Sequence, residues 1–176
     1  RKYKRWNTLL TPMAKYYASE MSMRVTNCSM GVLGGSGYMR DYPVERLLRD
    51  SRITTIYEGT SQLQVIAAIR GIVAGTINAV IDELVDRRWP DDIKRMVDEI
   101  RQGVGLLKEA VAFIKDKANS DYMDLYARQL VDMACVLLIG SQFCGQATAN
   151  EAKKAVAKRW LAAKMPQVRM NHEFAL

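Results

Sequence analysis

The sequence predicts an all-α protein: an antiparallel helical bundle with an appended long-helix pair. Three observations lead to this fold class. Apolar residues recur at three- and four-residue steps over long stretches, the chain has only 4 Pro, and few Gly lie outside one short stretch. With 49% apolar and 26% charged residues, the composition is ordinary for a soluble globular protein. No apolar run approaches the roughly 18 residues that span a bilayer.

The first half of the chain is predicted to contain a long helix, a glycine-rich loop and a short helix. An apolar stripe predicts the long helix over 9–32, and four glycines in "GVLGGSGY" end it. Pro43 suits the first turn of a short helix in "PVERLLRDSR". Because β-branched residues in a row disfavour helix, "ITTIYEG" at 53–59 is predicted to be a loop.

Three long helices are predicted for the rest of the chain. Thr60 or Ser61 can cap the first, which runs to about Arg87. The sequence "WPDD" separates it from a second amphipathic helix, which is predicted to run as far as Asn119. The third is predicted over 121–164.

The chain is expected to end in an irregular tail and to divide at one seam. Pro166 is expected to stop the last helix, so that "QVRMNHEFAL" forms the tail. The seam at "DRRWPDD" separates a first part, residues 1–86, from a second part, residues 87–176. Since the chain opens on Arg1 within a polar, basic stretch, we expect it to be part of a longer protein.

The charge of the chain points to no particular partner. A net charge of +7 can attract nucleic acid, anionic lipid or a phosphorylated ligand. No nucleic-acid-binding motif accompanies it, so we expect a solvated basic surface and no nucleic-acid partner. Trp160 lies among the basic residues Lys154, Lys158, Arg159 and Lys164. Two interpretations remain: a helix that lies on a membrane surface, or, more simply, a helix that packs on the rest of the protein.

The cysteines and the single histidine do not predict a metal site. Cys28, Cys135 and Cys144 form no CxxC motif, and their odd number argues against a disulfide framework. We expect reduced thiols in a reducing compartment, with Cys144 in the core. His172 lies in the expected tail without a partner and is expected to be structural or solvated.

Glu58 is the candidate catalytic residue. It follows the apolar residues Ile53, Ile56 and Tyr57 and precedes Gly59. A carboxylate that is shielded from water among such side chains has a raised pKa, which makes it a better base near neutral pH. The free N–H groups of the helix start that follows can bind phosphate, carbonyl or ring heteroatoms. The simpler alternative is a glutamate that only complements the helix dipole.

The segment "LGGSGYMRDYPVERLLRDSRITTIYEGTSQLQ" resembles the corresponding segment of the acyl-CoA dehydrogenase family. The likeness covers residues 8–75, where "GGSGY", "DYPVERLLRD" and "IYEGTSQLQ" recur in the family's order and spacing. The remaining residues, about 90 of them, are similar to an extra C-terminal helical region of some larger members. The resemblance implies that 1–86 belongs to the C-terminal helical bundle of the family's core and that 87–176 is the extra region.

This resemblance implies a chemistry. Family members use FAD to dehydrogenate an acyl-CoA thioester between its α and β carbons, and electrons then pass to an electron-transferring flavoprotein. A base removes the α proton while hydride leaves the β carbon for the flavin. Glu58 matches that base, and its backbone N–H matches the group that holds the thioester carbonyl. The enzyme is implied to lie in a bacterial cytoplasm or a mitochondrial matrix.

The resemblance also assigns neighbouring residues. Tyr57 and Gly59 match positions that line the acyl pocket, and Thr60 and Gln62 match positions that touch FAD. Gly35 matches a position in the glycine-rich loop that contacts the FAD of a neighbouring subunit, which implies a homo-oligomer.

The chain departs from the family pattern in two ways. Many members have a cofactor-contacting glutamine where this chain has Gly31. The family's amino-terminal helical domain and middle β-domain have no counterpart here, so the 176 residues alone are expected to be inactive. The alternative hypothesis is a non-catalytic helical module for oligomerisation or docking.

Overall fold

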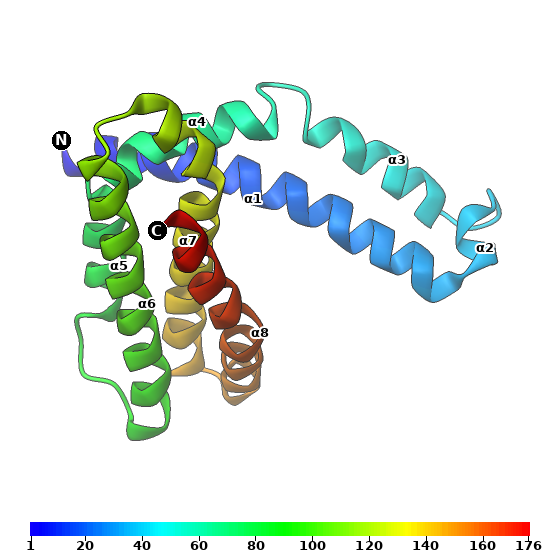
Figure 1. The fold of residues 1–176 in the computed structure, drawn as a ribbon. Helices are drawn as coiled ribbons and strands as arrows, with labels where there is room; N and C mark the ends of the chain where they lie inside the picture. Colours follow the sequence, from blue (N-terminus) through cyan, green and yellow to red (C-terminus); the bar gives the residue numbers. More distant parts are fainter.

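The computed structural model describes all 176 residues and confirms the all-α class (Figure 1). Its elements are α1 (Lys2–Leu33), α2 (Gly35–Tyr38), α3 (Val44–Thr54), α4 (Ser61–Val73), α5 (Thr76–Val85), α6 (Asp91–Asp116), α7 (Ser120–Ala147) and α8 (Glu151–Ala175). No strand separates them.

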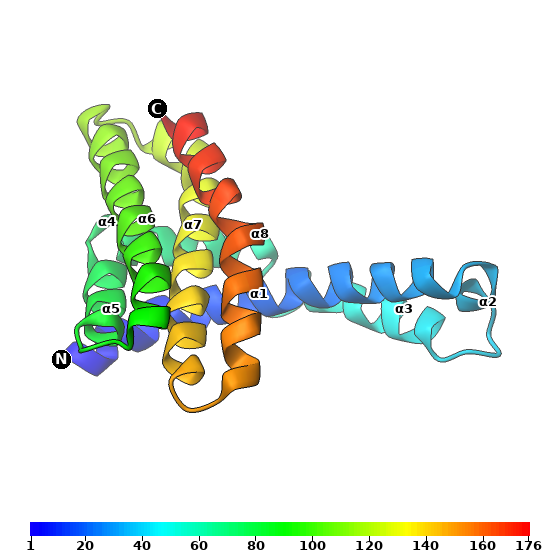
Figure 2. The same ribbon diagram turned by 90° about the horizontal axis from the view of Figure 1, so that it is seen from below.

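The molecule consists of a bundle and a projecting arm. The bundle contains α4 to α8 and the first half of α1 (Figures 1 and 2). The second half of α1 extends beyond it, with α3 running back along α1 and α2 closing the tip. At 1.5 Å per residue, the 32 residues of α1 span about 48 Å, which is long enough to serve both parts.

One core joins α1 to the later helices. It contains 33 buried residues, drawn from α1 and from α4 to α8. From α1 it takes Leu9, Met13 and Tyr16, which recur at helical spacing and therefore share one face. The core crosses the seam expected near residue 86, and the division into 1–86 and 87–176 remains a prediction.

A close approach between helices fixes α1 in the bundle. A Cβ added at Gly71 of α4 would lie 2.9 Å from Cδ1 and 3.1 Å from Cβ of Leu9. Leu9 is 1% exposed, so its side chain fills the space that the glycine leaves. Any larger residue at 71 would push α4 away from α1.

The prediction of one helix from Thr60 to Arg87 is wrong, because the helix is interrupted within this range. Thr60 does cap α4, where its hydroxyl accepts a hydrogen bond from the Leu63 N–H at 3.4 Å. Gly75, with φ 77°, then adopts the left-handed conformation that glycine favours. As a result, α4 and α5 meet at an angle of 72°.

The prediction of a single helix over 121–164 is also wrong, because this segment forms two helices, α7 and α8. The chain turns after Ala147, and the Asn150 side chain caps α8 by accepting from the Ala152 N–H at 2.9 Å. The region after residue 86 therefore has three long helices, α6, α7 and α8, where a pair was expected.

The expected tail is wrong as well, because α8 passes through Pro166 and continues to Ala175. A proline inside a helix costs about 3 kcal/mol. Met165, Val168 and Ala175 lie in the core at 1% exposure or less, and their burial offsets that cost.

Two smaller differences concern the arm. The β-branched run does not stop α3 at once, since Ile53 and Thr54 belong to its last turn. The glycine segment ends α1 as predicted, but Gly31 still lies within α1 and Gly35–Tyr38 forms the short helix α2.

A buried carboxylate links α1 to α7. The Tyr16 hydroxyl donates to Oδ1 of Asp132 at 2.7 Å. Burial raises the pKa of Asp132 above its ordinary value of 3.8, although the Tyr16 hydrogen bond and the charge of Arg128 act in the opposite direction. The folded state therefore binds the Asp132 proton more tightly than the unfolded state does.

This pKa shift predicts a pH dependence. Stability from Asp132 is fully present below its unfolded pKa and is lost as pH rises through the raised folded pKa. An Asp132→Asn variant should therefore gain stability relative to the wild type as pH rises from below 3.8 to neutrality. Urea unfolding at a series of pH values measures this difference. Asp124→Asn, at an exposed site on the same helix, is the control and should show no such trend.

Crowding at Gly103 gives a second prediction. A Cβ there would lie 2.5 Å from Cδ2 of Leu137 and 2.8 Å from Cε of Met165, whereas a Cβ at Gly105 would meet nothing within 4 Å. Both glycines lie inside α6, so Ala gains the same helix propensity at each. Gly103→Ala should be less stable than Gly105→Ala by about 1–3 kcal/mol in urea unfolding. Equal stabilities would contradict this crowding around Gly103.

Candidate active site

The turn between α3 and α4 carries the candidate base. After α3, the amides of Ile56 and Tyr57 both donate to the Ile53 carbonyl at 3.0 Å, which winds the chain through one more turn. Glu58 and Gly59 then follow with positive φ angles of 51° and 93°. A glutamate in this left-handed region is uncommon and costs free energy, so the surrounding contacts must hold it there.

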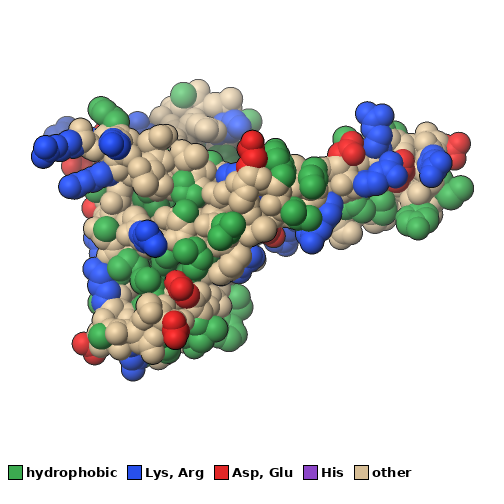
Figure 3. All heavy atoms as spheres, turned by 90° about the horizontal axis from the view of Figure 1, so that it is seen from above, with side chains coloured by type: hydrophobic (Ala, Val, Ile, Leu, Met, Phe, Trp, Pro, Cys, Tyr) green, Lys and Arg blue, Asp and Glu red, His purple; other side chains and the backbone are tan.

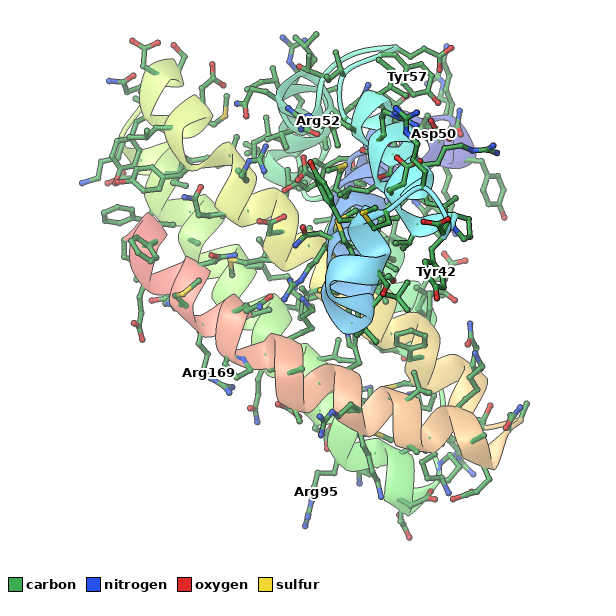
Figure 4. The ribbon with its side chains drawn as sticks, turned by 90° about the vertical axis from the view of Figure 1, so that its right-hand side faces the viewer. Tyr42, Asp50, Arg52, Tyr57, Arg95 and Arg169 are labelled. Atoms are coloured by element: carbon green, nitrogen blue, oxygen red, sulfur yellow. The ribbon has the colours of Figure 1, made fainter.

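The expectation that apolar neighbours shield Glu58 from water is wrong for this chain. Glu58 is exposed, and its neighbours Ile53, Ile56 and Tyr57 are themselves 54%, 47% and 49% exposed. Figure 4 shows Tyr57 at the edge of the molecule, beside the loop that follows α3. The reason is geometric: the turn lies where the arm joins the bundle, and no other helix of the chain covers its outer side.

The carbonyl groups of the turn are held from two sides. The Lys15 ammonium donates to the carbonyl of Thr54 at 2.7 Å and to that of Gly59 at 2.8 Å. From α4, the Gln64 amide donates to the Glu58 carbonyl at 3.1 Å and to the Gly59 carbonyl at 3.5 Å. The carbonyls are thus occupied inside the protein.

Two N–H groups of the turn, those of Glu58 and Gly59, are free. Neither the Glu58 N–H nor the Gly59 N–H donates a hydrogen bond within the chain. The exposed turn therefore combines one carboxylate with unpaired backbone donors. This combination can take a proton from a substrate and stabilise negative charge that develops on a neighbouring oxygen.

Two further predicted residues lie at the start of α4. Thr60 uses its hydroxyl oxygen to cap the helix, which leaves its O–H proton free to donate. Gln62 is exposed in the first turn of the helix. Both side chains lie where the helix dipole favours negatively charged groups.

The structure places Gly35 away from these residues. It lies in α2 at the tip of the arm, while Glu58 follows the other end of α3 (Figure 1). The 11 residues of α3 span about 16 Å. The turn thus brings together Tyr57, Glu58, Gly59 and Thr60, with Gln62 just beyond, but not Gly35. A Cβ at Gly35 would meet nothing within 4 Å, so its backbone is open to a large group.

Sequence reasoning missed the two residues that hold the turn. Lys15 lies 39 positions before Thr54, and its stretch of sequence predicts only a helix. Gln64 belongs to the motif "IYEGTSQLQ", but its helical periodicity does not reveal that it reaches back to Glu58. The contact of Gln64 could have been suspected, because this polar residue lies six positions after Glu58.

The remaining candidates have structural roles. His172 belongs to α8, where its Nε2 lies 3.1 Å from Oε2 of Glu109 on α6. Cys144 is fully buried, which confirms that it is a core thiol, and this burial raises its pKa to about 11. Trp160 packs against Phe143 and donates its indole N–H to the Val136 carbonyl at 3.2 Å. Its ring is therefore partly buried against the core.

One helix, α7, has the length and apolar composition of a membrane span. Within its apolar window, 61% is buried inside the bundle, which is typical of a core helix in a soluble protein. The bent pair α4 and α5 passes the same test only when taken together.

Comparison with known families identifies the class of protein. Residues 4–73 match the family model "Acyl-CoA dehydrogenase, C-terminal domain", and residues 73–172 match "Acyl-CoA dehydrogenase C terminal". The chain belongs to the acyl-CoA dehydrogenase family, and the resemblance carried by its motifs is confirmed. The two models meet at residue 73, near the break between α4 and α5.

Individual relatives support the same assignment. The chain is 46% identical over 67 residues to cyclohexane-1-carbonyl-CoA dehydrogenase from Geobacter metallireducens, covering 38% of this chain and 18% of that protein. It is 45% identical over 64 residues to an acyl-CoA dehydrogenase from Bacillus subtilis, covering 36% of this chain and 17% of the relative. The chain thus matches less than a fifth of the length of these relatives.

A solved structure supports the fold of nearly the whole chain. The crystal structure of Caenorhabditis elegans ACDH-11 in complex with C11-CoA superimposes with a TM-score of 0.78 at 20% identity. The match covers 91% of this chain and 29% of that protein. At this identity the likeness concerns the fold alone.

The backbone of the turn gives a third prediction. Gly59→Ala should lower the free energy of unfolding by about 1–2 kcal/mol, because alanine disfavours a φ of 93°. Its Cβ would also lie 2.7 Å from Nε2 of Gln64. Gly31→Ala adds the same methyl group within α1, where nothing lies within 4 Å, and should cost nothing. Urea unfolding of both variants makes the comparison, and equal stabilities would show that Gly59 does not need its left-handed conformation.

Proposed function

We propose that the full-length protein is a FAD-dependent acyl-CoA dehydrogenase and that Glu58 removes the α proton of the acyl-CoA thioester. One observation carries the proposal: the exposed turn presents a carboxylate beside the unpaired N–H groups of Glu58 and Gly59. This turn lies within residues 4–73, which match the family's C-terminal domain.

The proposed chemistry uses both features of the turn. The α proton of a thioester is only weakly acidic, so its removal requires a base and a stabilised carbonyl oxygen together. The Glu58 carboxylate accepts the proton from the α carbon, and the Glu58 N–H donates a hydrogen bond to the thioester oxygen. Positioned donors of this kind contribute a factor of about 10²–10³ in rate.

The residues present suit FAD as the cofactor. Thr60 has a free O–H donor, Gln62 has an exposed amide, and both lie at the N-terminus of α4. Gly35 exposes backbone that a large group can approach. When bound, the flavin accepts the hydride that leaves the substrate's β carbon. At Gly31 the chain lacks the side-chain amide of the family's usual glutamine, which removes one hydrogen bond to the cofactor.

The proposed partners follow from the exposed surface of the arm. Tyr38, Met39, Tyr42 and Leu47 are 77%, 56%, 46% and 52% exposed, and Figure 3 shows hydrophobic side chains along the arm. Apolar side chains gathered in this way mark a surface that another protein surface covers. We assign this role to a second copy of the protein in a homo-oligomer. An electron-transferring flavoprotein is the proposed electron acceptor.

Replacement of the base tests the proposal. In the full-length enzyme, Glu58→Gln should retain flavin and lose at least about 100-fold in the rate of α,β-dehydrogenation, because the amide cannot accept the proton. The measurement is the bleaching of bound flavin after anaerobic mixing with short-, medium- and long-chain acyl-CoA. This single turnover does not depend on the electron acceptor.

Glu151→Gln is the matched control, since Glu151 is exposed on α8, far from the turn, and its variant should react as the wild type does. Near-normal bleaching by Glu58→Gln would refute the role of Glu58. A full-length protein that neither binds flavin nor reacts with acyl-CoA, yet forms a stable oligomer, would instead support the non-catalytic helical module.

A further inference from the structure

Lys15 connects the buried part of α1 to the turn that carries Glu58. It lies between Met13 and Tyr16, which are 2% and 3% exposed, so the backbone around it is fixed by the core. From there its ammonium donates to the carbonyls of Thr54 and Gly59, at 2.7 and 2.8 Å. These carbonyls lie on either side of residues 55–58, so one ammonium group closes the turn.

Lys15 acts on the backbone of the turn and not on the carboxylate itself. No ion pair within 4.0 Å joins its ammonium to Glu58, and the ammonium lies 5.6 Å from the centroid of the Tyr57 ring. Its two hydrogen bonds are charge-assisted, which makes them stronger than those between neutral groups. The neutral amide of Gln64 adds a second support from α4.

The turn needs this support because of its conformation. Glu58 has a φ of 51°, and a residue with a side chain relaxes to an ordinary negative φ unless its surroundings prevent it. Such a relaxation would rotate the free N–H and the carboxylate of Glu58 together. A displacement of about 1 Å between reacting groups can reduce a rate by about 100-fold.

We propose that Lys15 is a positioning residue for α-proton abstraction, which holds Glu58 and its N–H in the reactive geometry through the carbonyls of Thr54 and Gly59. The inference rests on the proposed role of Glu58 as the base. It predicts that the loss of the ammonium group slows the chemical step and leaves the binding of flavin and substrate nearly intact.

The test uses three variants of the flavin-loaded, full-length enzyme. Lys15→Met keeps the aliphatic stem but removes the donors, and Lys15→Arg keeps donors that can reach both carbonyls. Lys158→Met changes an exposed lysine on α8 and is the matched control. Each variant is assayed for flavin content, for the rate of flavin bleaching by acyl-CoA in a single turnover, and for KM.

We expect Lys15→Met to reduce the bleaching rate by about 10- to 100-fold, with flavin content unchanged and KM altered by less than about threefold. Lys15→Arg should recover at least a third of the wild-type rate, and Lys158→Met should match the wild type. A wild-type rate in Lys15→Met, or an arginine variant as slow as the methionine variant, overturns the proposal.

Two outcomes need separate treatment. If Lys15→Met loses flavin, Lys15→Gln replaces it, because one short amide cannot bridge carbonyls on both sides of the turn. Loss of flavin in both variants overturns the proposal, since Lys15 would then support the fold as a whole. If Glu58→Gln reacts normally, the proposed function itself fails, whereas an inactive Glu58→Gln with an unaffected Lys15→Met defeats only this inference.

Discussion

The burial of one face of α1 in the bundle is the interaction on which the rest of the structure depends. Leu9, Met13 and Tyr16 place the first half of this helix in the core. Because the helix is continuous, the same residues set the direction of its exposed half, along which α3 lies. The arm and the turn behind it are therefore positioned by contacts made elsewhere in the molecule.

The turn shows how a rigid scaffold can hold a strained site. The carbonyls of Glu58 and Gly59 accept hydrogen bonds from side chains of α1 and α4, while their N–H groups have no partner in the chain. This division of the backbone groups leaves donors available to a ligand and stabilises the left-handed conformation that presents them. The apolar residues around Glu58 are half-exposed, so the shielding that its proposed role as a base needs would have to come from another surface.

Where sequence reasoning failed, tertiary packing outweighed local signals. Pro166 was expected to stop a helix, but three core residues on the same helix hold it together through the proline. Gly75 and Asn150 are ordinary turn and cap residues, yet the long apolar stripes around them favoured uninterrupted helices. The exposure of Glu58 could not be read from its apolar neighbours, because whether those neighbours are buried depends on what lies over the turn.

The sequence by itself determined the all-α class, the cap at Thr60, the end of α1 at the glycines and the family, because these depend on local periodicity, on backbone preferences and on short motifs. Only the tertiary structure decided that α7 and α8 fold back on each other, that Gly35 and Glu58 lie at opposite ends of α3, and that Lys15 reaches the turn. The physical reason is distance along the chain. Contacts between residues about forty positions apart follow from how helices pack, and no local pattern in the sequence encodes them.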